Sequence, residues 1–205
     1  MQVKPKVLIG TPNKGDIKFD THMSLISVFI GAADYDVAHL GAASAAIDYN
    51  RNWICKWALD NGTVTHICFV DTDMTFPSDT VSRLLALNKP VVGVGSRKKI
   101  FPRTYTTEID EPDGWRSLTP NDMPKEPFCK VNGYPIRVGT GVMLIDLEKV
   151  KHISRPWFRM DSYWNENEVG YTGEDIYFCR KVWKAGLEVW CEPRIQIGHI
   201  GDFKY

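Results

Sequence analysis

Two aspartates separated by one residue follow a strongly apolar segment of the chain. Asp71-Thr72-Asp73 comes directly after residues 66–70 (HICFV), which have the composition of a buried strand. Ligands of open α/β sheets bind beyond the carboxyl ends of the strands. Two carboxylates there suit Mg²⁺ or Mn²⁺, which take oxygen ligands and share them with a diphosphate. The alternative is a turn in which both aspartates bond nearby backbone N–H groups.

A second acidic pair, Glu174-Asp175, opens a segment with helical periodicity. One of these carboxylates could serve as a general base. The alternative is a helix cap: Thr172 and Asp175 have capping-box spacing, and Glu174 complements the helix dipole. A carboxylate at a helix N-terminus is expected to have a lowered pKa, which weakens it as a base near pH 7. Taken alone, the pair favours capping.

Two glycine-flanked segments complete the set of residues that could do chemistry. Gly198-His199-Ile200-Gly201 follows an apolar segment, and histidine binds borderline metals, although a lone histidine is more often structural. Gly139-Thr140-Gly141 precedes an apolar run. Paired glycines permit close approach of the backbone to a substrate, but they also fit a plain β-bulge.

The elements that must position these residues alternate between short apolar segments and longer helical patterns. This alternation predicts an α/β fold with right-handed crossovers and a mostly parallel sheet. Strands are expected at 7–10, 37–40, 66–70, 90–95, 188–191 and 195–197, and helices at 22–30, 44–61, 78–87 and 172–185; structure also resumes over 136–146.

The pattern of the helix at 44–61 also predicts which side faces the core. Ala46, Tyr49, Trp53 and Trp57 recur at helical spacing, so they are expected to form the apolar face. Arg51 lies roughly opposite Trp53, off the apolar face, so it could instead be solvated beside Asp48. Asn61-Gly62 provides a C-terminal stop.

The composition and periodicity of the chain change after Ser96. Residues 101–130 carry five of the twelve prolines and show no periodicity. A segment of this kind inside a compact domain is usually functional or disordered, so we expect a mobile loop that serves as a lid. Lys98, Lys99 and Arg103 could approach a diphosphate, but a solvated charge run is the favoured interpretation.

Composition narrows the class of protein. The 205 residues carry 25 Lys+Arg and 25 Asp+Glu, a balance that argues against a nucleic-acid partner. No apolar stretch is long enough to span a membrane, and the apolar part of the N-terminus is too short for a signal peptide. Five cysteines without metal-site spacing indicate reduced, mostly buried thiols. A single-domain cytoplasmic protein is expected.

In this order and spacing, the motifs resemble those of the GT-A-fold glycosyltransferases, and most closely the small family-2-like enzymes. The resemblance runs from about Val7 to Gly201, and the pair Arg51-Asn52 also looks like one that recurs in that family. It implies a single GT-A domain, with a nucleotide-binding half at about 1–96, the mobile loop at 97–130 and an acceptor and catalytic half at 131–205.

The resemblance also implies a function: metal-dependent transfer of a hexose from a nucleotide-diphosphate sugar to an acceptor hydroxyl, with UDP-glucose or UDP-galactose as the expected donor. A glycan, lipid, protein or small molecule could be the acceptor, and inversion fits the Glu-Asp pair better than retention. By analogy, Asp175 is the base and Glu174 orients a substrate. The cation, Mn²⁺ or Mg²⁺, is bound by Asp71, Asp73 and His199. The residues that hold the nucleotide and the sugar are Thr11, Pro12, Arg51, Asn52, Asp71, Thr72, Gly139, Thr140 and Gly141.

Other functions remain open at this point. Asp71-Thr72-Asp73-Met74-Thr75 obeys the D-x-D-x-T pattern of haloacid-dehalogenase-like phosphatases, but two expected strands precede it, whereas that motif normally follows the first strand. A sugar-nucleotide pyrophosphorylase lacks support because residues 11–15 do not form its Gly-rich loop. A non-catalytic glycan or nucleotide-sugar binding module on the same scaffold is the alternative from another class. Aromatic rings can stack on sugars, which makes Trp157 and Trp164 candidates for sugar contact, while Trp183 and Trp190 are expected in the core.

Overall fold

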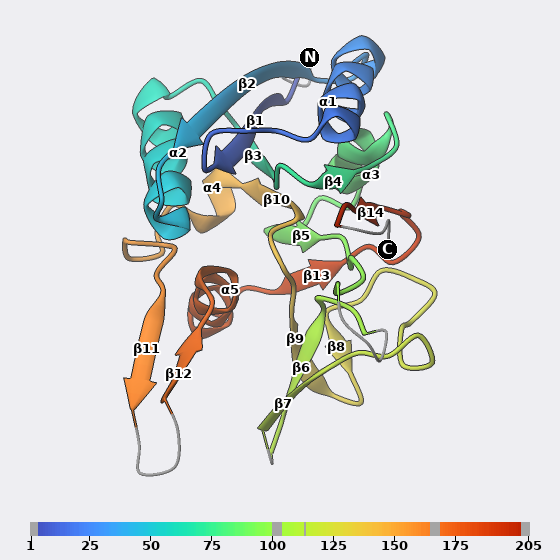
Figure 1. Cartoon of the computed structure of the whole chain (residues 1–205), viewed down its shortest axis with the longest axis vertical. Coiled ribbons are helices and arrows are strands. Elements are labelled where there is room, and N and C mark those ends of the chain that lie inside the picture. The colour runs from blue at the N-terminus through green and yellow to red at the C-terminus, as the bar shows by residue number, and fades with distance from the viewer. Residues whose placement is uncertain (1–3, 100–103, 113, 165–168, 202–205) are drawn as a thin grey trace.

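A mixed six-stranded sheet forms the centre of the molecule (Figure 1). The computed structural model describes residues 4–99, 104–112, 114–164 and 169–201. One strand, β10, runs antiparallel to both neighbours, and the other pairs in the sheet are parallel. The order across the sheet is β13 (Val189–Cys191), β5 (Val91–Gly93), β10 (Val142–Asp146), β3 (His66–Val70), β1 (Lys6–Asn13) and β2 (Asp36–Ala43). The predicted mostly parallel α/β sheet is confirmed.

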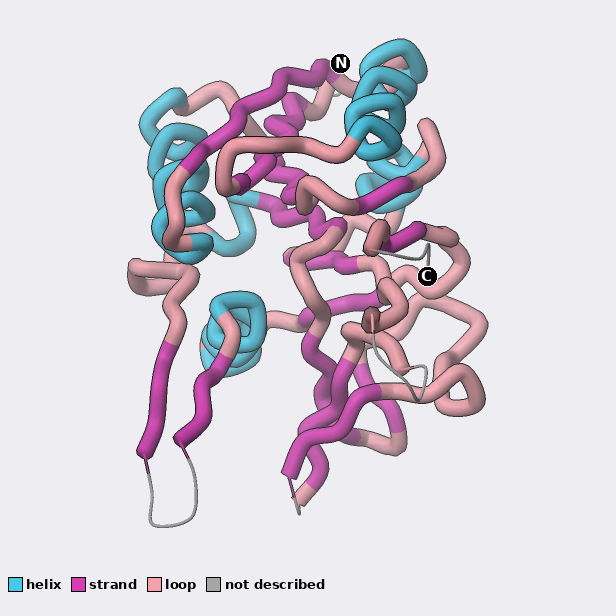
Figure 2. The backbone as a smooth tube through the Cα atoms, viewed as in Figure 1, coloured by secondary structure: helices cyan, strands magenta, loops and turns pink. Residues whose placement is uncertain are grey.

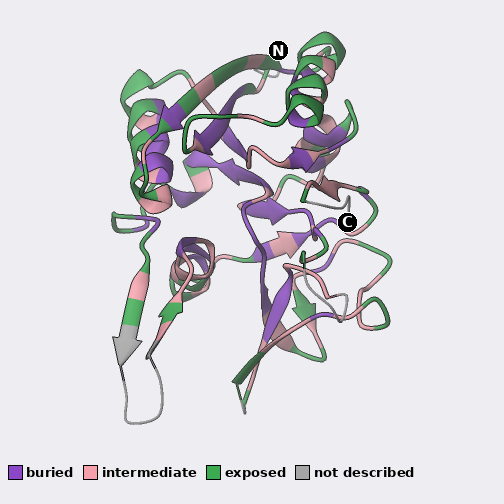
Figure 3. Ribbon diagram, in the orientation of Figure 1, coloured by how far each residue is buried: buried purple, intermediate pink, exposed green. Residues whose placement is uncertain are grey.

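Helices cover both faces of this sheet because its central strands are apolar on both sides. In β3, Ile67 and Phe69 enter one core cluster, while Cys68 and Val70 enter the other. The first cluster packs against α2 (Ile47–Asn61), α4 (Leu147–Val150) and α5 (Glu174–Lys184). The second packs against α1 (Phe19–Gly31) and α3 (Thr80–Ala86). Figure 3 shows the buried strands between the half-exposed helices.

A short ladder brings a late segment of the chain to the end of β3. Strand β4 (Met74–Thr75) pairs with β14 (Gly198–His199), and His199 lies opposite Met74. The backbone N–H of Ile200 donates to the carbonyl of Asp73 at 2.7 Å. This pairing places His199 beside the aspartate motif, although 126 residues separate His199 from Asp73 in the chain.

The segment expected to be an irregular loop contains regular structure. Strands β6 (Glu108–Glu111) and β7 (Gly114–Ser117) form a hairpin in a four-stranded sheet of order β7-β6-β9-β8 (Figure 2). The other two strands are β8 (Lys130–Val131) and β9 (Tyr134–Arg137). The strands are too short to show periodicity, and the prolines lie outside β6 and β7. Beside this sheet, β11 (Asp161–Trp164) and β12 (Val169–Thr172) form a second hairpin.

The orientation predicted for α2 is wrong. Tyr49, Trp53 and Trp57 are 60%, 41% and 39% exposed, so the aromatic face points to solvent. The buried side of the helix is instead made by Asn50, Arg51, Ile54, Cys55 and Ala58. Two polar residues can lie on it because both find polar partners in the interior. The predicted stop is present, since Gly62 caps the helix with φ +67°, a left-handed conformation that favours glycine.

The predicted capping box of α5 is not formed. Gly173 is the N-cap residue, and no side chain caps the first turn. The Oδ1 atom of Asp175 accepts from the neighbouring N–H of Ile176 at 2.7 Å, so this carboxylate does not bond back to Thr172.

Two other expectations concern cysteines and membrane spans. All five cysteines are free, and all except Cys129 are buried, as expected. Over the part of the chain that the structure describes, none of the helices combines the length and the apolar character needed to cross a bilayer.

Candidate functional site

A cavity of about 370 Å³ lies where the aspartate motif, the glycine segment and the start of α5 meet. Its lining contains most of the residues that the sequence motifs predict: Pro12, Arg51, Asp71, Thr72, Asp73, Gly139, Thr140, Gly141, Glu174, Asp175 and His199. Residues from both expected halves of the chain therefore form one site, at the carboxyl end of β3.

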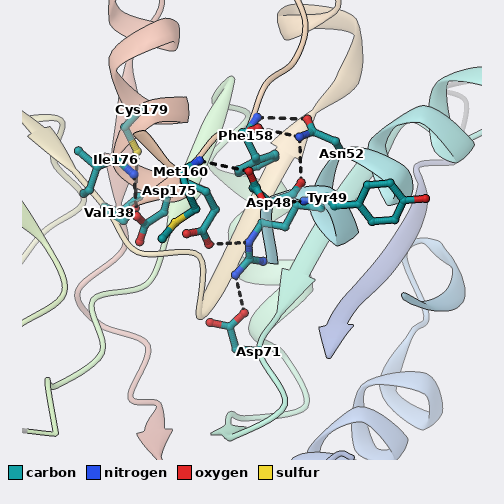
Figure 4. A network of polar contacts seen from close by, with 12 residues as sticks. Asp48, Tyr49, Asn52, Asp71, Val138, Phe158, Met160, Asp175, Ile176 and Cys179 are labelled. Atoms are coloured by element: carbon teal, nitrogen blue, oxygen red, sulfur yellow. Dashed lines mark hydrogen bonds and ion pairs between the residues drawn. The ribbon is translucent and has the colours of Figure 1, made fainter. Parts of the chain in front are cut away.

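Arg51 joins the two acidic motifs inside this cavity. Its Nη2 donates to Asp71 Oδ1 at 2.7 Å, and its Nε donates to Glu174 Oε1 at 3.0 Å. In Figure 4 the dashed line that ends on Asp71 marks the first of these bonds. The side chain is buried, and its Cζ lies 5.2 Å from the centroid of the Phe69 ring. Burial alone would lower the pKa of Arg51, but Asp71 and Glu174 outweigh it and hold that pKa above its ordinary value. Arg51 is therefore part of the site, and the alternative of a solvated side chain beside Asp48 is wrong.

Asp73 and His199 lie together at the end of the β4–β14 ladder. His199 Nε2 is 3.4 Å from Asp73 Oδ2, and His199 Nδ1 is 3.1 Å from the carbonyl oxygen of Arg97. Lys99 Nζ also contacts Asp73 Oδ2, at 2.6 Å. Partial burial opposes ionisation of Asp73, but His199 and Lys99 overcome it and lower its pKa to about 2. Lys99 is exposed, as expected, but it is also a partner of the motif; Arg103 lies outside the described residues.

Asp175 has the electrostatic environment of a base that works near neutral pH. Burial and the neighbouring Glu174 raise its pKa to about 7, although the N–H of Ile176 and the charge of Arg51 oppose the shift. The expectation of a lowered pKa from the helix N-terminus is wrong because removal from water and a neighbouring negative charge dominate. A group with this pKa can accept a proton at neutral pH.

Glycines leave room for the Asp175 carboxylate. A Cβ atom on Gly173 would lie 2.7 Å from Asp175 Oδ1, and one on Gly139 would lie 3.6 Å from Asp175 Oδ2. The Gly139 position also abuts Thr106, at 3.1 Å from its Cβ atom. The Asp175 carboxylate can occupy its position because neither glycine has a side chain.

Two residues expected to hold the nucleotide lie outside the cavity lining. The buried hydroxyl of Thr11 lies 2.7 Å from His39 Nε2. The amide of Asn52 bonds the carbonyls of Asp48 and Phe158 and accepts from the N–H groups of Trp157 and Phe158 (Figure 4). Its bonding capacity is used in fixing the segment at 157–158. We therefore leave Thr11 and Asn52 out of the proposed binding surface.

Of the two tryptophans that were candidates for sugar contact, Trp157 does not have the expected position. Trp157 is 1% exposed and donates from Nε1 to the carbonyl of Ile153 at 3.0 Å, so it is a core residue. The side chain of Trp164 lies outside the described residues. Trp183 and Trp190 are half-buried and pack against the core clusters, as expected.

The cavity also contains residues that no motif indicated: Asn13, Lys14, Asp16, Ile47, Met74, Ser96 and Thr106. Ser96 and Thr106 are joined through their hydroxyls at 3.1 Å. Residues 13–16 follow the expected first strand, so the topological rule for strand ends could have identified them. Thr106 falls in the segment treated as a loop, and no local pattern marks it.

Asp73 and His199 fit a divalent cation better than Asp71 does. A carboxylate and an imidazole are both ligands for Mn²⁺, and such ions commonly complete their shell with substrate phosphates and water. One oxygen of Asp71 is already bonded to Arg51, which leaves the other available. Among the described residues, no three His, Cys, Asp or Glu side chains converge as a ready-made metal cage. A diphosphate would therefore have to supply the remaining ligands of a cation bound here.

No protein-family model and no curated protein sequence matches the chain. Solved structures do resemble it. The structure of A197 from STIV matches with a TM-score of 0.60 at 16% identity, covering 96% of this chain and 86% of that one. A structure of GalNAc-T7 with UDP, GalNAc and Mn²⁺ matches with a TM-score of 0.52 at 12% identity, covering 98% of this chain but 44% of that one. At these identities the likeness concerns the fold, and the chain has the GT-A-like α/β fold that the sequence predicts.

Proposed function

We propose that the chain is a metal-dependent glycosyltransferase that moves a hexose from a nucleotide-diphosphate sugar to an acceptor hydroxyl with inversion. UDP is the proposed nucleotide, and glucose or galactose is the proposed sugar. The observation that carries the proposal is that one cavity is lined both by the Asp73–His199 pair and by Asp175, whose pKa is about 7. A site for a cation and a base for an acceptor are thus within one enclosure.

The charge of the cavity supports dependence on a metal. Five carboxylates line it, on Asp16, Asp71, Asp73, Glu174 and Asp175, against two basic side chains, Lys14 and Arg51. The guanidinium of Arg51 is already shared between two of those carboxylates. A bare diphosphate would be repelled here, since like charges at close range disfavour each other. Asp73 and His199 would hold the cation, which supplies Lewis-acid stabilisation of the leaving diphosphate when bound.

The chain's own residues account for the rest of the reaction. Transfer forms a bond between the acceptor oxygen and the anomeric carbon, breaks the bond from that carbon to the diphosphate oxygen, and releases the hydroxyl proton. Asp175 accepts this proton, and Glu174, fixed by Arg51, lies beside the base. Thr72 and Gly139 to Gly141 line the space for the donor. Placing both substrates in one geometry contributes a large part of the rate.

Ligand-dependent thermal unfolding tests the proposal directly. UDP, GDP, CMP and ADP would each be added with Mn²⁺ and again with EDTA. A ligand at 100 times its dissociation constant stabilises the folded state by about 2.7 kcal/mol, which moves the midpoint by several degrees in a chain of this size. We expect a shift with UDP that requires the metal. If another nucleotide gives a metal-dependent shift, the proposed transferase activity stands, but the donor carries that nucleotide in place of UDP.

Two alternatives predict different results in the same experiment. A haloacid-dehalogenase-like phosphatase would show no nucleotide shift but would release inorganic phosphate from simple phosphomonoesters. In that case Asp71 would be the nucleophile, yet one of its oxygens is held by Arg51. A non-catalytic binding module would bind the nucleotide sugar tightly without turnover, so any hydrolysis of the donor in the presence of Mn²⁺ would exclude it.

A further inference from the structure

A second cavity, of about 710 Å³, lies on the other side of the start of α5. It is bounded by the hairpin β6–β7, strand β9 and strand β12, and Gly173 and Ile176 contribute to its lining. In Figure 1 the two hairpins, β6–β7 and β11–β12, extend in the same direction beside α5. Apart from Thr172, which the capping-box spacing singled out, its lining residues are not named in the sequence motifs, and the proposed donor site uses none of them.

Two exposed aromatic rings line this second cavity. Trp115 is 58% exposed, and Tyr171 is 71% exposed, whereas most large rings among the described residues are at least half-buried. They come from different hairpins, β7 and β12. Flat rings on an open cavity provide an apolar surface for the C–H face of a sugar ring, while the edge of the sugar remains available for hydrogen bonds.

A buried guanidinium beneath the rings offers hydrogen-bond donors. Arg137 is 2% exposed, lines the cavity, and has its Cζ 5.5 Å from the centroid of the Trp115 ring. Its Nη2 lies 3.3 Å from Asp110 Oδ1 and 3.5 Å from Glu108 Oε2. Despite these ion pairs, Nε and Nη2 have no hydrogen-bond partner among the described residues. Buried donors are normally satisfied, so these two donors suit a ligand rich in oxygen atoms.

Asp175 lines the first cavity and lies next to Gly173, a lining residue of the second. Gly139 lines the first cavity and Gly173 lines the second, and the Asp175 carboxylate lies against the positions where both would carry a Cβ atom. A molecule in the second cavity that reaches past Gly173 would therefore come to the proposed base, with the donor site beyond it. An acceptor hydroxyl needs this position, because the base must be within hydrogen-bond reach of the proton it removes.

We propose that the second cavity binds the acceptor and that the acceptor is a carbohydrate, with a sugar ring held by Trp115 and Tyr171 and its oxygens bonded by Arg137. This inference rests on the proposed function for the direction of transfer, but the binding of a saccharide to the cavity does not require transfer. Arg180, which is exposed and also lines the second cavity, provides further hydrogen-bond donors. The acceptor is therefore a carbohydrate and not a lipid or a protein hydroxyl.

Ligand-observed NMR tests the site without depending on turnover. The probes are the methyl glycosides of glucose, galactose, mannose and N-acetylglucosamine, together with glucuronic acid, each added to the wild-type chain and to the variants Trp115→Ala and Tyr171→Ala. Both rings are exposed, so the variants should fold. An aromatic contact is worth about 0.5–1.5 kcal/mol, so each variant should bind roughly 2- to 10-fold more weakly. Tyr49→Ala removes an equally exposed ring from α2, outside the cavity, and should bind like the wild type.

The outcomes separate the failure of the site from the failure of the function. Saccharide binding that is unchanged in Trp115→Ala and Tyr171→Ala would overturn the site. No binding of any probe to the wild-type chain, at concentrations where UDP and Mn²⁺ still shift unfolding, would overturn the carbohydrate class. If UDP and Mn²⁺ give no shift but the glycosides still bind at the two rings, the transferase fails while the carbohydrate site stands.

Discussion

Arg51 and Glu174, which are 123 residues apart in the chain, are joined by a hydrogen bond of 3.0 Å from Nε to Oε1 in the interior. The same guanidinium bonds Asp71, so one cation ties helix α2 to the end of β3 and to the start of α5. The catalytic half and the nucleotide half of the proposed site are thus connected by a single side chain, and its loss should affect both stability and geometry.

Replacing Arg51 tests this connection. Arg51→Met keeps much of the apolar stem but leaves Glu174 buried without a counter-charge, which should cost about 3–5 kcal/mol of the free energy of unfolding. Chemical denaturation measures the loss. The double variant Arg51→Met with Glu174→Gln should recover part of it, because the unpaired charge is gone.

The control for Arg51→Met lies on the same helix. Lys56 forms an exposed pair with Asp60, and an i,i+4 pair of this kind is worth about 0.3–0.5 kcal/mol. Lys56→Met should therefore change stability little. If Arg51→Met were as stable as Lys56→Met, the buried network would have no role in holding the site together.

Asp175 should make stability depend on pH. Its pKa is about 7 in the folded chain, above the ordinary value of the unfolded one. The folded state therefore binds this proton more tightly, so the contribution is favourable below about pH 4 and is lost as pH rises toward 7. Asp175→Asn removes that dependence and should melt at a higher temperature than the wild type at pH 8. Glu148→Gln, at an exposed carboxylate, should show no such difference.

The same carboxylate should set the acid limb of activity. Transfer by the wild type should rise with pH through about 7 as Asp175 loses its proton. Asp175→Asn should retain metal-dependent nucleotide binding and lose transfer by roughly two to four orders of magnitude, the range typical of general-base catalysis. Full turnover in this variant would show that Asp175 is not the base, and a retaining or substrate-assisted reaction would then explain the site better.

How far the sequence predicts this arrangement depends on whether the signal is local. The end of β3 and its aspartates are evident from residues 66–73 alone, because an apolar strand followed by acidic residues is a local pattern. The place of His199 follows from motif order and not from any contact readable in the sequence. The β4–β14 ladder that carries it consists of two-residue strands, which leave no periodic trace.

The errors arise where long-range contacts override a local pattern. In α2 the aromatic spacing suggests the wrong face, since Arg51 is drawn inward by carboxylates that come from two other elements. The pKa of Asp175 depends on burial and on Glu174, whereas the sequence reveals only the helix start. Both departures occur at the proposed site, where polar groups are buried for reasons other than folding.

Lys99 should compete with a cation for Asp73. The ammonium contacts Asp73 Oδ2 at 2.6 Å, and both side chains are partly exposed. A pair of this kind is worth roughly 0.2–1 kcal/mol, so Lys99→Met should bind Mn²⁺ up to about fivefold more tightly. Mn²⁺ binding is measured by electron paramagnetic resonance without nucleotide. Asp73→Ala and His199→Ala should weaken both Mn²⁺ binding and metal-dependent nucleotide binding.

The direction of the Lys99 effect distinguishes two roles. Tighter Mn²⁺ binding together with weaker UDP binding would mean that the ammonium moves from Asp73 to the diphosphate once the metal is present. Unchanged Mn²⁺ binding would mean that Lys99 does not oppose the cation. Lys56→Met serves again as the control, because it removes a similar charge far from the lining of the cavity.

Gly173 should control where the Asp175 carboxylate lies. Its φ of −60° suits any residue, so Gly173→Ala introduces no backbone strain, but the new Cβ atom would lie 2.7 Å from Asp175 Oδ1. The carboxylate must therefore move, and displacement of a catalytic group by about 1 Å can cost roughly 10²-fold in rate. We expect a fall in kcat with unchanged binding of UDP and Mn²⁺. Gly31→Ala, whose Cβ atom would meet Ser78 at an ordinary 3.6 Å, is the matched control. A Gly173→Ala variant with wild-type kcat would show that the position of this carboxylate does not limit transfer.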